Sequence, residues 1–317
     1  MLLIVAVAGA GLILSLDHAP TEEGRPELTA RGHDIVAPRL AAIDLDIQQL
    51  AAGGDGIAAA GRDTLTRLRT LDTTRTEEAL EAGNSAVADV TATRDRITTA
   101  RATLLEGISL VGLPASDRVR IGTIDAAMAA AGELPGYWQQ VGVAASGPLE
   151  FLQSLQAHDD RVVTATDQGR AADWAAALGV LDDAQRLLVP VRAVREVAAK
   201  AGLDVTTLDD LLARIDDYDQ SLIALYANLQ ASGGETTNES RAALARVEAA
   251  QASLPEDQSA LVVIVSDMAG PTITPVLLSI ESARGALEAA LDAEPQPSGA
   301  ATETSGSGPE PSSGVSS

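Results

Sequence analysis

The sequence predicts an all-α protein, built from antiparallel amphipathic helices that form one or two helical bundles. Aromatic residues make up only 2% of the 317 residues, whereas β-sheet domains are usually richer in aromatic and β-branched side chains. Alanine, the best helix former, is abundant, and apolar residues recur three and four positions apart along much of the chain. Short breaks separate long periodic segments, which favours antiparallel packing of neighbouring helices.

The first sixteen residues, 1–16 (MLLIVAVAGAGLILSL), form an uncharged apolar segment that is followed directly by Asp17. As a helix this segment would span about 24 Å, short of the roughly 30 Å hydrocarbon core of a bilayer. It suits an uncleaved signal anchor, which we favour, or a cleaved signal peptide. The third alternative is a buried N-terminal helix of a cytosolic protein. Because no Lys or Arg precedes the apolar residues, we expect that the true start lies upstream or that the N-terminus has been shortened.

A polar segment with two prolines and a glycine follows at residues 17–34, and we interpret it as a juxtamembrane linker. Residues 35–111 are predicted to form a helical hairpin or bundle segment. Its first helix carries apolar residues at the alternating four- and three-residue spacing of an amphipathic seam: Val36, Leu40, Ile43, Ile47 and Leu50. The glycines of residues 53–56 predict a turn or weak kink, and a second helix is expected to end near Gly107.

The clearest internal break is Gly112-Leu113-Pro114, where we expect a domain boundary. Residues 112–293 are then predicted to form a second helical bundle. Glycine and proline divide it into expected helices at 117–131, 147–166, 170–201, 207–231, 236–253, 257–269 and 274–293.

The best-defined helix covers residues 207–231, where leucine and isoleucine recur every seven residues before a stop at Gly233-Gly234. Thr236 and Glu239 have the spacing of a capping box for the next helix. Residues 294–317 are low in complexity and rich in Pro, Gly, Ser and Glu, so we expect a disordered tail.

The composition excludes several classes of partner and chemistry. The net charge of −23 excludes nucleic acid as a partner, because phosphates require a basic surface, and argues against docking on anionic lipid head groups. Cysteine is absent, which excludes disulfides, thiolate metal sites and cysteine nucleophiles. Lys200 is the only lysine among 22 basic residues, and alanine and glycine are common, which indicates a GC-rich bacterial genome.

Two acidic pairs in the predicted helix 207–231 could hold a metal ion. Asp209-Asp210 and Asp216-Asp217, the latter followed by Tyr218-Asp219, resemble the acidic pairs that hold magnesium in prenyl-diphosphate enzymes. With Leu208 at heptad position a, however, both pairs fall at the outward positions b and c. Arg214 lies within helical reach of either pair. We therefore interpret these residues as a solvated face and predict no metal site and no cofactor, with a metal-dependent enzyme as the remote alternative.

The three histidines do not indicate a further site, and known catalytic motifs are absent from the sequence. His18 and His33 fall in the predicted linker, and we interpret His158 as an exposed histidine at a helix end. The sequence contains no Glu-x-x-His pattern, nucleophile elbow, P-loop or dinucleotide fingerprint. We therefore predict no catalytic residues.

Tyr137 and Trp138 are the candidate ligand-binding residues. They are two large aromatics within a stretch punctuated by glycine and proline, and such residues can line a pocket between helices. The alternative is that they fill a gap in the core or close a helix end.

These observations favour a non-enzymatic, membrane-anchored, extracytoplasmic binding or scaffold protein. Its contacts would be the membrane, through the N-terminal segment, and a protein partner. The alternative is an extracytoplasmic ligand-sensing bundle that binds a small molecule and works with a partner subunit. If the N-terminal segment is cleaved, the protein would be secreted.

Overall fold

The computed structural model describes residues 26–255 and 257–292 of the chain. Within these residues there are seven α-helices, one short 3-10 helix and no strand, so the all-α prediction is confirmed. The predicted membrane segment, residues 1–16, and the predicted tail, residues 294–317, lie outside the described residues. The elements are α2 (Pro26–Arg69), α3 (Thr73–Leu104), η2 (Leu110–Gly112), α4 (Ala115–Arg170), α5 (Trp174–Lys200), α6 (Thr206–Ala231), α7 (Asn238–Ser253) and α8 (Ser259–Asp292).

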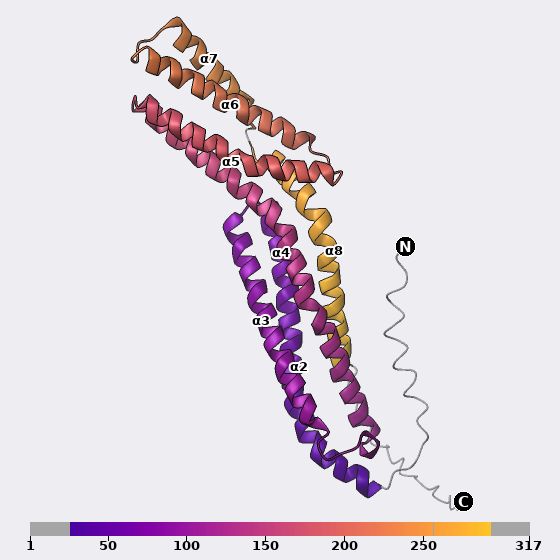
Figure 1. Cartoon of the computed structure of the whole chain (residues 1–317). Coiled ribbons are helices and arrows are strands. Elements are labelled where there is room, and N and C mark those ends of the chain that lie inside the picture. Colours follow the sequence, from indigo (N-terminus) through magenta and orange to yellow (C-terminus); the bar gives the residue numbers. More distant parts are fainter. Residues whose placement is uncertain (1–25, 256, 293–317) are drawn as a thin grey trace, which may run out of the picture.

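The helices form an elongated, bent rod (Figure 1). We call one end the base: α2 and α4 begin there and α3 ends there. We call the other end the tip: it contains the turn between α4 and α5 and the turn between α6 and α7. Helix α4 has 56 residues and runs from base to tip. At about 1.5 Å per residue it is about 84 Å long, so this one helix determines the length of the molecule.

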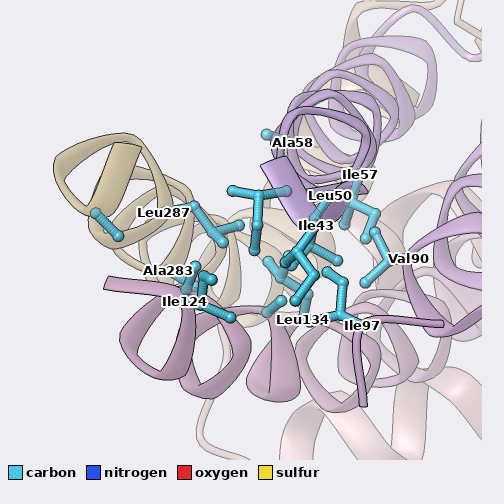
Figure 2. Close-up of a cluster of buried hydrophobic side chains, with 14 of the residues drawn as sticks. Ile43, Leu50, Ile57, Ala58, Val90, Ile97, Ile124, Leu134, Ala283 and Leu287 are labelled. Carbon is cyan, nitrogen blue, oxygen red and sulfur yellow. The ribbon is translucent and has the colours of Figure 1, made fainter. Parts of the chain in front are cut away.

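The half of the rod nearer the base is a four-helix bundle of α2, α3, the first part of α4 and α8. Its core, the base cluster, is made mostly of aliphatic side chains, and Figure 2 shows members from all four helices pointing toward one another between the helices. They include Ile43 and Leu50 of α2, Ile97 of α3, Leu134 of α4 and Leu287 of α8. Each fully buried side chain of this size contributes about 1.5–3 kcal/mol. The base cluster contains residues from both sides of position 112, and the domain division there stays a prediction.

A second group of buried residues, the middle cluster, lies where the two halves of the rod meet. It joins the end of α2, the centre of α4, the second half of α5 and the beginnings of α6 and α8. Three of the helices in this region carry a proline close to their cluster residues: Pro148 in α4, Pro190 in α5 and Pro271 in α8. Proline removes a backbone hydrogen bond and bends a helix, which accounts for the bend of the rod at this level.

The tip cluster joins the end of α4, the first part of α5, α6 and α7. Many of its buried side chains are small, and they include Ala165, Ala177, Ala184 and Ala243. Alanine lets helices approach closely but buries little apolar area, so this cluster is thinner than the base cluster. The α6–α7 hairpin is held against α4 and α5 through this layer.

The turn predicted at residues 53–56 is absent, because α2 is continuous from Pro26 to Arg69. The glycines there serve helix packing instead. A β-carbon on Gly53 would lie 2.6 Å from Val90 Cγ2 of α3, and one on Gly54 would lie 3.2 Å from Leu287 Cδ1 of α8. Glycine therefore lets three helices approach, a role that a single sequence does not distinguish from turn formation.

Two other predicted breaks are wrong for a related reason. Residues 117–131 and 147–166 were expected as separate helices, but α4 runs unbroken through Gly132 and Pro135. Helix α8 likewise runs through Gly270 and Pro271. Burial on both sides of each site, for example of Leu134 and Ile273, stabilises the helix beyond the local cost of proline.

The predicted linker, residues 17–34, is partly wrong. Residues 17–25 lie outside the described part, but Pro26 begins α2, and proline is favoured in the first turn of a helix. The polar composition of this stretch obscured a helix that packs through Gly32, where a β-carbon would lie 2.4 Å from the Gly112 carbonyl oxygen.

Candidate functional site

The two candidate pocket residues, Tyr137 and Trp138, lie on different faces of α4. Trp138 is 4% exposed and faces α3, where its indole Nε1 donates to Asn84 Oδ1 at 2.8 Å. The ring occupies the space above Gly83, since a β-carbon there would lie 1.9 Å from Trp138 Cζ2. Trp138 thus fills a gap between α3 and α4, and its one polar atom has a partner.

Tyr137 lies on the side of α4 that faces α8. It borders a shallow depression of about 240 Å³ together with small and polar residues of both helices: Ala130, Glu133, Ser279, Ser282, Ala283 and Ala286. The structure therefore does not bring Tyr137 and Trp138 together in one pocket. Ligand binding at Tyr137 stays a prediction.

Among the candidate residues, His158 has the environment that differs most from the one the sequence predicts. It was expected to be exposed at a helix end, but it is 2% exposed and lies within α4, because that helix continues to Arg170. Its Nε2 lies 3.0 Å from Oδ2 of Asp219 on α6, and Asp219 is fully buried. Its Nδ1 lies 3.2 Å from Oδ1 of Asp159, an exposed neighbour.

A periodic signal for this pair was present in the sequence. Phe151, His158 and Ala165 are seven residues apart on α4, and all three are buried. On α6, Leu212 and Tyr226 lie seven residues before and after Asp219, and both are apolar and buried. A charged residue within each of two apolar stripes therefore indicated a buried polar pair.

The acidic pairs of α6 take part in ion pairs between helices. Asp209 accepts two hydrogen bonds from Arg195 of α5, at 2.6 and 2.7 Å, and Asp216 accepts one from Arg192. Arg214, which was expected to pair with these carboxylates, donates instead to the Ser253 carbonyl oxygen of α7. Among the described residues, no group of three or more His, Cys, Asp or Glu side chains could hold a metal ion.

A polar network at the base was not anticipated. His33, assigned to the linker, has its Nδ1 2.9 Å from Oδ2 of Asp117, which is 5% exposed. Nη1 of Arg39 donates to the carbonyl oxygens of Thr103 and Leu104, each at 3.0 Å, and so caps the end of α3. These contacts join α2 to the end of α3 and the start of α4, and no local motif predicts them.

Helix α8 is the one described helix long and apolar enough to cross a membrane, with a hydropathy of 1.8 over its best 18 residues. That test uses length and composition only, and core helices of soluble proteins also pass it. Here α8 packs along α2 and α4 through buried residues such as Ile273 and Ile280, and its Arg284 forms an ion pair with Asp55 of α2. Helix α8 is thus joined to the bundle along one side, but only 22% of its apolar 18-residue window is buried, so it differs from the mostly buried core helix of a soluble protein.

Comparison of the chain with protein-family models, with curated proteins and with solved structures found no match.

Proposed function

We propose that the protein is a non-enzymatic binding or scaffold module, anchored by residues 1–16 to the outer face of a bacterial membrane. The helical rod would stand away from the bilayer on its base and hold its tip, about 84 Å farther out, within reach of a protein partner.

The observation that carries this proposal is the position of the first described residue. Helix α2 begins at the base, at one extreme of the rod (Figure 1). The nine residues 17–25 separate it from the apolar segment, and fully extended they would reach at most about 30 Å. An anchor at residues 1–16 would therefore hold the base close to the membrane and leave the tip free.

The chemistry of the described residues also supports a structural role. The acidic side chains Asp209 and Asp216 are engaged by arginines, and His158 is enclosed between helices. Such groups hold helices together, and the imidazole of His158 is poorly accessible to a substrate. Two hollows among the described residues, of about 240 and 460 Å³, are shallow depressions on the bundle surface.

The proposal is tested by the orientation of the chain in intact bacterial cells. Because the chain contains no cysteine, a single Ala171→Cys substitution gives one thiol at the exposed turn between α4 and α5. We expect it to react with a membrane-impermeant maleimide before lysis, and the protein to remain with the membranes after an alkaline wash.

The matched control places two charges in the apolar segment, with Val5→Arg and Leu12→Arg in the same cysteine variant. This chain should lose its membrane association, because arginine at the centre of a spanning segment costs about 2.5–3.5 kcal/mol. Labelling of the original variant only after lysis, together with recovery in the soluble fraction, would overturn the proposal.

A further inference from the structure

The imidazole of His158 lies between two carboxylates. Its Nε2 is 3.0 Å from Asp219 Oδ2, and its Nδ1 is 3.2 Å from Asp159 Oδ1. A neutral imidazole has one N–H donor and one acceptor nitrogen, whereas the imidazolium has two donors. Because a carboxylate only accepts, this geometry fits the protonated ring. The buried pair is therefore a charged one, with Asp219 as the anion.

Asp219 depends on this single partner. The residue has no exposed surface, and its second oxygen, Oδ1, is buried without a hydrogen-bond partner. If His158 lost its proton, the Asp219 carboxylate would lie inside the bundle without a compensating charge. An uncompensated buried charge is far more costly than a paired one, so the two helices would be driven apart or the interior hydrated.

The position of the pair makes this cost important for the fold. His158 belongs to the α4–α5 hairpin and Asp219 to the α6–α7 hairpin, and the tip cluster that joins the two hairpins is rich in alanine. The apolar area that opposes their separation is therefore smaller than that of the base cluster. The base cluster, by contrast, contains larger aliphatic side chains, and in the histidine–aspartate pair at that end of the rod, His33 and Asp117, the imidazole is exposed.

We propose that His158 and Asp219 form a protonation-dependent latch that holds the α6–α7 hairpin against α4 and α5. The latch is independent of the function proposed above. It would make the tip of the rod the part of the molecule whose packing responds to pH.

The pKa of His158 agrees with this assignment. Burial lowers the pKa of the imidazole, but the hydrogen bonds and charges of Asp159 and Asp219 outweigh burial and raise it to about 9. Since the pKa in the unfolded chain is about 6.5, the folded state binds the proton more tightly. The stabilisation is complete below pH of about 6.5 and is lost as the pH rises through about 9.

The other ionisable side chains on these helices, apart from Tyr226, are exposed, paired with one another, or, for Tyr218, half-buried. Those nearest the pair include Asp160, Arg161, Asp167 and Arg170 on α4, Asp182, Asp183, Arg186 and Arg192 on α5, Asp216, Asp217 and Tyr218 on α6, and Arg246 and Glu248 on α7. The phenol of Tyr226, also on α6, is buried in the tip cluster, and burial raises its pKa. Burial and the charge of Asp219 raise the pKa of Tyr218, so this phenol stays neutral where His158 titrates.

Thiol protection in the full chain tests the latch. Ala243→Cys places a reporter in the tip cluster on α7, and Ala131→Cys places a control in the base cluster; both alanines are buried. The rate of maleimide labelling is divided by the rate for the same variant in urea, which removes the pH dependence of the thiol itself. Between pH 7 and 9.5 we expect protection at Ala243→Cys to fall about tenfold or more, and protection at Ala131→Cys to stay constant.

Substitution of the pair identifies the responsible group. Asp219→Asn in the Ala243→Cys chain should abolish the pH dependence, whereas Asp216→Asn, which removes an exposed ion pair with Arg192, should retain it. If Asp219→Asn fails to fold, a double His158→Leu and Asp219→Leu variant replaces the pair with apolar groups and should be protected at both pH values. Constant protection in the parent chain, or pH dependence that survives loss of the pair, would overturn the latch.

Discussion

At the scale of the residue, close helix contacts depend on a few glycines. Gly83 of α3 lies under the indole of Trp138, and Gly61 of α2 lies against Leu277 of α8, where a β-carbon would be 2.5 Å from Leu277 Cδ2. Neither glycine is in a turn. Each glycine costs helix stability locally, by about 0.5–1 kcal/mol relative to alanine, and permits a large side chain of another helix to pack closely, with Trp138 buried and Leu277 partly buried.

The substitution Gly83→Ala tests this packing. The added methyl group would overlap Trp138 and force the indole or the helix to move, so we expect a loss of about 1–3 kcal/mol in the free energy of unfolding. Gly122→Ala in α4 is the matched control, because nothing lies within 4 Å of its β-carbon. This control should stabilise the protein by about 0.5–1 kcal/mol. Urea unfolding followed by circular dichroism measures both, and equal effects would contradict the packing.

The candidate site could be predicted only in part. Tyr137 and Trp138 were chosen for residue type, but consecutive residues of a helix are about 100° apart and so face different neighbours. His158 and Asp219 were misjudged because each was considered with its charged sequence neighbours. The seven-residue spacing to Phe151 and Tyr226 carried the correct information.

At the scale of the element, helix ends follow local chemistry where a cap is present. Helix α7 begins with a capping box in which Ser240 N donates to Thr237 Oγ1 at 3.0 Å and Thr237 N donates to Ser240 Oγ at 2.9 Å. The box predicted from Thr236 to Glu239 is therefore displaced by one residue. Thr236 and Thr237 each lie three residues before a polar residue, Glu239 and Ser240 respectively, and the backbone conformation decides which threonine caps the helix.

Substitution of the two threonines distinguishes the two caps. Thr237→Ala should cost about 1 kcal/mol and raise hydrogen exchange in the first turn of α7, because the amide of Ser240 loses its acceptor. Thr236→Ala, at an exposed position just before the cap, should change exchange in α7 little. The reverse order of effects would place the cap at Thr236.

The ends of helices could be predicted where residues at the end itself stop the helix. The end of α6 before Gly233-Gly234 is confirmed, and both glycines have positive φ, of 63° and 88°. The end of α7 before Pro255 is also confirmed. The breaks expected at Gly132 and Gly270 failed because tertiary burial on either side outweighs the preference of single residues. Helix type was therefore predictable from periodicity, whereas helix length depended on contacts with distant segments.

At the scale of the whole molecule, a single helix connects the two halves. The sequence predicted one or two bundles, and the base and tip clusters are two groups of buried residues linked by a middle cluster. Their common member is α4, whose 56 residues pass through all three. Periodicity does not predict this connection, because it depends on Pro135 and Pro148 lying inside a helix.

Ion pairs between helices help to set the register of the rod. Arg96 of α3 binds Asp46 of α2 at 2.9 Å, and Arg101 of α3 makes a two-pronged contact with Asp125 of α4 at 2.9 and 3.0 Å. The planar guanidinium suits such paired contacts better than the ammonium of lysine. Each exposed pair contributes little to stability, and together they favour one alignment of long, smooth helices.

The proposal that the rod stands upright on a membrane is tested most directly by energy transfer from the protein to lipid. The full chain, reconstituted into vesicles that contain an acceptor lipid, would carry a donor dye at Ser116→Cys near the base or at Ala171→Cys at the tip. Both positions are exposed, at opposite ends of α4, and about 80 Å separates them along the helix. We expect strong transfer from the base and almost none from the tip. Equal transfer from both positions, or none from either, would contradict an upright, anchored rod.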